Sequence, residues 1–204
     1  KAILNAHGLP TAKARLLTSA EEVTDLRFPL FVKPNAEDAS LGIHPESRVA
    51  DQDALRCQVD RLLRTYEQPV LVEEYIDGRE FNVAVFDNHE LQALPVSEID
   101  FSGMPASAPR ICSYEAKWFE DHEFYTHTVP VCPAKIGEET RDKLQATALA
   151  AFRATGCRDY ARVDFRMDGA GNLAILEVNP NPDISLNAGY ARALRAFGLD
   201  YKLF

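Results

Sequence analysis

The sequence is short of cysteine pairs, long apolar segments and basic residues. Its four cysteines form no CxxC pair, which argues against a zinc knuckle or thioredoxin-type site and favours reduced thiols; they are Cys57, Cys112, Cys132 and Cys157. No apolar run approaches the roughly 18 residues that a membrane-spanning helix needs. The chain has 22 Lys and Arg but 31 Asp and Glu, for a net charge of −9. This acidic balance disfavours a general nucleic-acid surface. We therefore expect a cytoplasmic protein that binds neither nucleic acid nor a membrane.

The 204 residues, 46% of them hydrophobic, can form one domain or two small lobes. Apolar periodicity predicts helices over residues 1–7, 51–66, 138–155 and 188–197, and strands over 30–33, 70–75, 80–86, 160–168 and 173–178. Ser19 and Glu22 fit a capping box for a further short helix. Residues 90–133 indicate only loose β structure. Regular βαβ spacing and a GxGxxG motif are both missing, so we predict an α+β architecture with largely antiparallel sheets.

Residues 162–179 have the pattern of a β-hairpin with a turn at 169–172. We expect Asp168 opposite Leu173, and that register places Asp164 opposite Glu177. The alternation of a strand then separates two faces. The polar face holds Arg162, Asp164, Glu177 and Asn179; the apolar face holds Val163, Phe165, Met167, Ala174, Leu176 and Val178.

The polar face of this hairpin is the strongest candidate site. Asp164, Glu177 and Asn179 supply the oxygen ligands that Mg²⁺ prefers while leaving room for phosphate oxygens. Arg162 beside them can neutralise an anion. The alternative is a solvated hairpin face with ordinary salt bridges.

Other candidates are weaker when taken alone. Lys33 and Lys117 could bind phosphate, or they could be solvated lysines. Glu73, Glu74 and Glu80 flank a turn at 75–78 whose backbone could read an adenine edge while a carboxylate holds ribose hydroxyls. Acids at solvated strand ends are the alternative for these three residues.

The order of the motifs resembles that of the ATP-grasp enzymes, closest to the D-alanine–D-alanine ligase branch. The motifs are Phe28-Pro-Leu-Phe-Val-Lys33-Pro, Glu37-Asp-Ala-Ser-Leu-Gly42, Val72-Glu-Glu-Tyr-Ile-Asp-Gly-Arg-Glu80-Phe, Tyr114-Glu-Ala-Lys117, Arg162-Val-Asp164 and Glu177-Val-Asn179-Pro-Asn-Pro. Together they extend over nearly the whole chain.

The resemblance implies a role for each matching position. Lys33 and Lys117 match lysines on the ATP phosphates, and the loop 37–42, with Ser40, matches the lid over the triphosphate. The adenine-reading hinge corresponds to Glu73, Glu74, Tyr75 and Ile76, and the ribose acid to Glu80. The magnesium ligands correspond to Asp164, Glu177 and Asn179, and the arginine that stabilises the tetrahedral intermediate to Arg162.

The resemblance further implies an ATP-grasp fold of two lobes, residues 1–78 and 79–204, with ATP bound between them. The implied activity is ATP-dependent ligation of a carboxylate to an amine through an acyl phosphate, with two Mg²⁺ ions, or with Mn²⁺. A homodimer and an upstream N-terminal domain absent from this chain are also implied. A non-catalytic ATP-binding module and a phosphotransferase that uses the same Mg-ATP site are the alternatives.

Three departures from the D-alanine–D-alanine ligase pattern fall on the amino-acid side of the site. Ala39 replaces the first of two adjacent serines, Trp118 replaces a tyrosine, and residues 183–188 replace the turn that holds the substrate carboxylate. We therefore expect an amino-acid or peptide substrate other than D-alanine, contacted by Asp183, Ser185 and Asn187.

Overall fold

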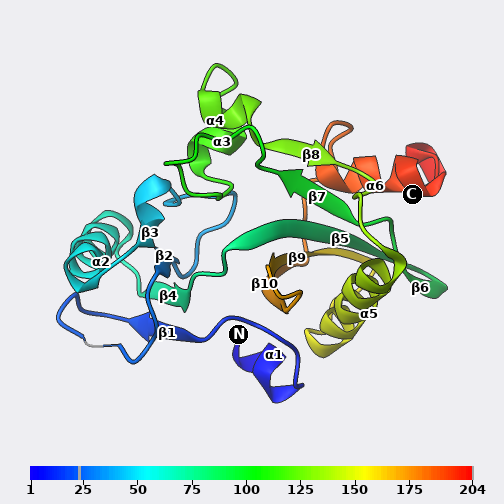
Figure 1. Cartoon of the computed structure of the whole chain (residues 1–204). Helices are drawn as coiled ribbons and strands as arrows, with labels where there is room; N and C mark the ends of the chain where they lie inside the picture. The colour runs from blue at the N-terminus through cyan, green and yellow to red at the C-terminus, as the bar shows by residue number, and fades with distance from the viewer. Residues whose placement is uncertain (23, 204) are drawn as a thin grey trace. The chain divides into compact units, whose positions relative to one another are not determined.

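The computed structural model describes residues 1–22 and 24–203, and Figure 1 shows its elements. The helices are α1 (Ala2–Ala6), α2 (Gln52–Tyr66), α3 (Tyr114–Trp118), α4 (Glu123–Thr126), α5 (Glu138–Ala154) and α6 (Gly189–Phe197), with 3₁₀ turns η1 (Pro45–Ser47) and η2 (Tyr201–Leu203). The strands are β1 (Ala14–Leu17), β2 (Leu30–Pro34), β3 (Arg48–Val49), β4 (Val70–Glu74), β5 (Gly78–Asn88), β6 (Glu90–Ala93), β7 (Ser97–Asp100), β8 (Val129–Val131), β9 (Tyr160–Asp168) and β10 (Leu173–Asn179). The predicted α+β class with antiparallel sheets is confirmed.

The chain forms two compact units. Unit 1 contains residues 1–11, 77–100 and 130–204, and unit 2 contains residues 12–76 and 101–129. The lobes expected from the sequence, 1–78 and 79–204, stay a prediction. Among the described residues, no helix has both the length and the apolar character that crossing a membrane requires.

Unit 2 is built on a four-stranded sheet in the order β1-β4-β2-β3. Helix α2 starts at Asp51, whose side chain accepts a hydrogen bond from the Ala54 amide at 2.9 Å and so satisfies one free N–H of the first turn. Its apolar stripe packs on one sheet face, where Leu55, Val59 and Leu62 meet residues of β2 and β4. The opposite face is thereby left to the alternate residues of β2 and β4, which include two of the predicted site residues.

Unit 1 is built on a sheet in the order β10-β9-β5-β7-β8, with β6 also paired to β5. Helix α5 packs on one face through Leu144, Ala148 and Phe152, and Figure 1 shows it alongside β5. Fully burying a leucine or phenylalanine side chain contributes about 1.5–3 kcal/mol. Helix α6 packs against Ala84, which lies on the other face of β5. The rest of that second face carries the polar residues of β5, β9 and β10.

In the β9–β10 hairpin, the predicted register is wrong next to the turn and right farther from it. The predicted pairing of Asp168 with Leu173 is wrong, because Leu173 lies opposite Met167. A β-bulge between Ile175 and Glu177 shifts the register by one residue, and beyond it Glu177 lies opposite Asp164 as predicted.

The bulge also changes which residues of β10 face the core. Ala174 pairs with Arg166, which places it on the polar face and not on the apolar face as predicted. Ile175 takes the core position and is fully buried, while Leu176 occupies the bulge. The prediction for Val163 and Phe165 is confirmed, since both are fully buried.

Some short elements differ from the predictions. Residues 14–17 form β1, where no strand was predicted, and the loosely β region contains the helices α3 and α4. No helix follows Ser19 within the described residues; Glu22 instead accepts hydrogen bonds from the amides of Thr18 and Ser19 at 2.8 and 2.9 Å. The capping contact therefore forms around a turn without a helix.

Candidate active site

In unit 1, the polar face of the hairpin brings together the predicted metal ligands. Arg162 donates two hydrogen bonds to Asp164, one to each carboxylate oxygen, and both are 2.7 Å long. Both side chains are mostly buried, at 18% and 15% exposed. Glu177 lies directly across the sheet from Asp164, and Asn179 lies across from Arg162. A bidentate, partly buried pair of this kind holds the Asp164 carboxylate in one orientation.

The donor set at this face suits a hard divalent cation. Asp164 and Glu177 offer carboxylate oxygens and Asn179 an amide oxygen, which already accepts a hydrogen bond from the Asn181 amide at 2.9 Å. Among the described residues, no three His, Cys, Asp or Glu side chains gather closely enough to hold a metal ion. The predicted set has only two carboxylates, so phosphate or water oxygens would have to complete the coordination.

Glu80 lies on the same sheet face, one strand away. It pairs across the sheet with Arg166, which donates a hydrogen bond to it and is 4% exposed. Burial raises the pKa of Glu80, Arg166 opposes the rise, and the nearby carboxylates of Asp164 and Glu177 add to it. Sequence reasoning did not select Arg166, although its spacing of two from Asp164 places it on the polar face.

In unit 2, Lys33 meets Glu73 on the sheet face opposite α2. The lysine Nζ lies 3.5 Å from a Glu73 carboxylate oxygen, and the two side chains are 17% and 4% exposed. Strand alternation turns the adjacent Glu74 to the other face, where it forms an ion pair with Arg27 at 3.2 Å. The hydrogen bond from Arg27 lowers the pKa of Glu74. Glu73, and not Glu74, therefore shares a face with the predicted phosphate-binding lysine.

The predicted adenine hinge continues from β4 into the turn before β5. The Tyr75 amide donates a hydrogen bond to the Pro29 carbonyl at 3.0 Å, and the Tyr75 hydroxyl donates to the Arg110 carbonyl at 3.2 Å. Ile76 is half-buried. The Tyr75 amide is thus already used within unit 2, and the contact of residues 73–76 with a base stays a prediction.

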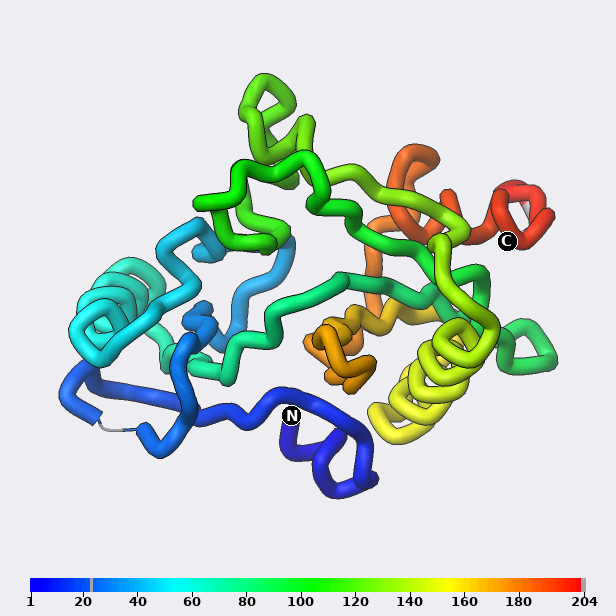
Figure 2. The backbone as a smooth tube through the Cα atoms, in the orientation of Figure 1, coloured from blue at the N-terminus to red at the C-terminus, as the bar shows by residue number. Residues whose placement is uncertain are grey.

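The loop predicted to cover phosphate, residues 37–42, contacts the segment that carries Lys117. The Ser40 hydroxyl donates to the Cys112 carbonyl at 3.0 Å, and the Trp118 indole N–H donates to the Ala39 carbonyl at 2.9 Å. Figure 2 shows the two segments, light blue and green, running side by side. Two of the positions that departed from the family pattern, Ala39 and Trp118, are therefore in contact with each other.

Gly42 closes this loop with a conformation that other residues adopt rarely. Its φ is +76°, and a Cβ atom would lie 2.5 Å from Cγ of Pro34. A side chain at this position would displace the loop from β2.

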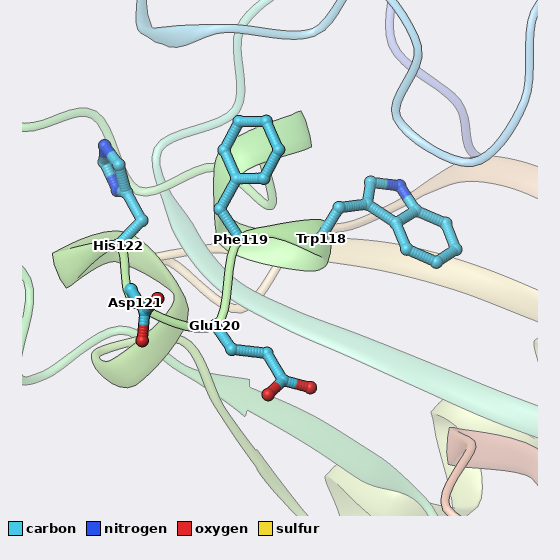
Figure 3. A pocket seen from close by; sticks show the side chains of 5 residues that line it. All are labelled: Trp118, Phe119, Glu120, Asp121 and His122. Atoms are coloured by element: carbon cyan, nitrogen blue, oxygen red, sulfur yellow. The ribbon is translucent and has the colours of Figure 1, made fainter.

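Lys117 is exposed on α3, and its Nζ lies 5.7 Å from the centre of the Trp118 ring. A shallow pocket follows directly along the chain, lined by Trp118, Phe119, Glu120, Asp121 and His122 (Figure 3). Trp118 and Phe119 are about half exposed. Trp118 thus lines this pocket and also contacts the loop 37–42.

A second contact between the loop region and α3 joins His44 to Glu115. Nδ1 of His44 lies 2.5 Å from a Glu115 carboxylate oxygen, and the Tyr114 amide donates to the Ile43 carbonyl at 2.8 Å. Sequence reasoning set His44 aside, because a lone histidine without metal-ligand spacing carries no signal.

The predicted substrate contacts lie in the loop between β10 and α6. Asp183 accepts hydrogen bonds from the amide and the hydroxyl of Ser185, at 2.8 and 2.5 Å, and the Asn187 carbonyl accepts one from Arg192. All three predicted residues are exposed. The structure brings Asp183 and Ser185 together but does not test whether they bind a substrate.

Solved structures with the same fold define the class of protein. The D-alanine–D-alanine ligase of Bacillus anthracis complexed with ATP is 25% identical with a TM-score of 0.75, and the match covers 99% of this chain and 60% of that one. The VanG D-Ala:D-Ser ligase of Enterococcus faecalis is 23% identical with a TM-score of 0.77, over 99% and 57% of the two chains. The fold is therefore the ATP-grasp fold, as predicted.

The family follows from the sequence comparison. The family model described as the D-ala D-ala ligase C-terminus matches residues 4–204, and the chain belongs to that family. The uncharacterized protein y4sG of Sinorhizobium fredii is 37% identical over 202 residues, 98% of this chain and 57% of that protein. D-alanine–D-alanine ligase B of Chromobacterium violaceum is 31% identical over 206 residues, 99% and 62% of the two. The chain thus spans about three fifths of the length of these relatives.

Proposed function

We propose that the chain is the ATP-binding part of a carboxylate–amine ligase that forms an amide bond through an acyl phosphate. Family membership supports the proposal, and the observation that carries it is the polar face of unit 1. There Arg162 holds Asp164, with Glu177 directly opposite, on a rigid pair of strands. A preorganised group of carboxylates beside a guanidinium suits phosphoryl and acyl transfer.

The reaction would proceed in two steps. An oxygen of the substrate carboxylate attacks the γ-phosphorus, the bond from phosphorus to the β,γ-bridging oxygen breaks, and ADP leaves. The amine of the second substrate then attacks the acyl carbon, loses a proton, and displaces inorganic phosphate. Arg162 would stabilise the oxyanion that forms in this second step, and Lys33 and Lys117 would neutralise phosphate charge.

Residues of several of the sequence motifs would hold the nucleotide and its cation. Asp164, Glu177 and Asn179 would hold Mg²⁺, which when bound neutralises charge on the phosphate oxygens. Glu80 would contact the ribose, residues 73–76 the adenine, and Ser40 the phosphates. The number of ions, and whether Mn²⁺ can replace Mg²⁺, stay predictions.

The substrate is proposed to be an amino acid or small peptide other than D-alanine. Three observations support this: the contact between Ala39 and Trp118, the altered loop, and its Asp183–Ser185 turn. In this proposal Asp183 pairs with a substrate ammonium group, and Ser185 and Asn187 make hydrogen bonds to it. A homodimer, an upstream domain and a cytoplasmic location likewise stay predictions.

A phosphate-release assay tests the function. The chain is mixed with Mg-ATP and a panel of amino acids and dipeptides, and products are identified by mass spectrometry. We expect release that depends on the added substrate, together with an amide product. Arg162→Ala should lower turnover by about 10²–10³-fold, the typical loss for an oxyanion-stabilising group, while ATP binding is retained.

Arg153→Ala is the matched control, because Arg153 is an exposed arginine on α5. A stable phosphorylated product without an amide would favour the phosphotransferase, and ATP binding without phosphate release would favour the binding module. Unchanged turnover in Arg162→Ala would exclude the role given to this arginine.

A further inference from the structure

Arg166 and Glu80 form a buried ion pair in the sheet of unit 1 that the proposed reaction does not use directly. Arg166 on β9 lies directly across from Glu80 on β5. Its side chain is 5% exposed and that of Glu80 is 13% exposed. On the other side of β9, Arg166 pairs with Ala174, whose methyl group leaves room for the long arginine side chain.

The hydrogen bonds of the pair are unequal between the two carboxylate oxygens. Nε and one terminal nitrogen of Arg166 both contact Oε2 of Glu80, at 3.0 and 2.8 Å. The other terminal nitrogen donates to the Gly78 carbonyl at 3.4 Å. These contacts hold one oxygen of Glu80, and the second oxygen, Oε1, is a hydrogen-bond acceptor of the same carboxylate.

Stability alone does not explain this arrangement. A buried ion pair recovers little more than its desolvation cost, and apolar residues of similar volume often replace such a pair without loss of stability. The pair also lies on the same face as the predicted metal ligands, since Asp164 is two residues from Arg166 on β9. Three carboxylates share this face, and their mutual repulsion would turn Glu80 away if no cation held it.

We propose that Arg166 is a positioning residue that fixes the Glu80 carboxylate so that Oε1 is presented to the ribose hydroxyls of bound ATP. The inference rests on the proposed function, in which Glu80 contacts the ribose. It assigns to Arg166 the selection of ribonucleotides over nucleotides that lack these hydroxyls. A hydrogen bond to a charged acceptor loses strength quickly when the acceptor is misdirected.

The test compares two nucleotides on four proteins. Binding of ATP and of 2′,3′-dideoxy-ATP, each with Mg²⁺, is measured by calorimetry for the unmodified chain, Arg166→Met, Glu80→Gln and the double variant. We expect the unmodified chain to prefer ATP by about tenfold or more, which corresponds to about 1.4 kcal/mol. Arg166→Met should bring the preference close to one, and Glu80→Gln should add little to that loss in the double variant.

Arg79→Met is the matched control, because Arg79 is the neighbour of Glu80 on β5 but pairs with Glu98 at 2.6 Å. Its preference for ATP should equal that of the unmodified chain. If Arg166→Met does not fold, Arg166→Gln takes its place in the comparison.

The outcomes distinguish a failure of the proposed function from a failure of the role given to Arg166 alone. An unmodified chain that binds no Mg-ATP would overturn the proposed function and this inference with it. Binding of both nucleotides with the same preference in the unmodified chain and the Arg166 variant would overturn the inference alone. A lower thermal stability of the Arg166 variant with an unchanged preference would mean that the pair is only structural.

Discussion

His44 and Glu115 form a short contact between the loop region and α3. Burial alone would raise the pKa of Glu115, but hydrogen bonds from its own amide, from His44 and from Ser113 together lower it. The second carboxylate oxygen, Oε2, is buried without a hydrogen-bond partner among the described residues. The pKa of this carboxylate, in the motif that carries Lys117, is therefore lowered by its own amide and by the side chains of His44 and Ser113.

The lowered pKa of Glu115 predicts a pH dependence of stability. A carboxyl group with a lower pKa in the folded state stabilises the fold above its unfolded pKa, and this contribution is lost as the pH falls through the folded pKa. Glu115→Gln should lower the free energy of unfolding by about 1 kcal/mol at neutral pH. The difference from the unmodified chain should shrink towards pH 3, roughly one unit below ordinary carboxyl pKa values. Urea unfolding at several pH values measures both quantities.

Glu120→Gln is the control for this prediction, because Glu120 is exposed in the same segment. It should change the free energy of unfolding little at any pH. A loss in Glu115→Gln that stays constant from neutral to acidic pH would contradict the coupling to His44 and Ser113.

Among secondary-structure elements, α6 is joined to the unit 1 sheet by a buried tyrosine hydroxyl in addition to its apolar contacts. Tyr190 is fully buried, and its hydroxyl donates to the Val85 carbonyl at 2.8 Å. Its ring packs against Tyr160 at 5.7 Å between centres. Helix α6 follows the loop with the predicted substrate contacts, so this hydrogen bond also holds the end of that loop.

Tyr190→Phe should lower the free energy of unfolding by about 1 kcal/mol, because the ring stays packed while a buried carbonyl loses a partner. Tyr125→Phe, at an exposed tyrosine, should leave it nearly unchanged. Thermal unfolding followed by circular dichroism compares the two variants. Equal midpoints for both would show that the Tyr190 hydroxyl does not stabilise the docking of α6.

For the whole chain, binding of Mg-ATP should appear as added stability. A ligand at about 100 times its Kd adds about 2.7 kcal/mol to the free energy of unfolding. We expect ATP with Mg²⁺ to raise the midpoint of thermal unfolding, and EDTA to remove most of the rise. Glu177→Ala should lose the magnesium-dependent part, whereas Glu90→Ala, at an exposed acid on β6, should retain it.

An equal rise in Glu177→Ala and in the unmodified chain would exclude Glu177 as a metal ligand. A rise that EDTA leaves unchanged would show that the nucleotide binds without a divalent cation.

The sequence alone determined the features that depend on local periodicity and on the chemistry of short motifs. Alternation along two strands predicted that Asp164 and Glu177 lie opposite each other, and the apolar stripe of α2 predicted its packing face. These features follow from the repeat of the backbone, which is 2 residues in a strand and 3.6 in a helix. The order of motifs was sufficient to identify the family.

Only the tertiary structure decided the contacts between residues distant in sequence. The bulge at Leu176 shifts the register, so counting from the turn placed the pairs next to the turn one residue off and the pairs beyond the bulge correctly. The pairings of Arg166 with Glu80, of Trp118 with Ala39 and of His44 with Glu115 join residues 71 to 86 positions apart. Local sequence carries no signal for such pairs, because strand order and packing bring them together.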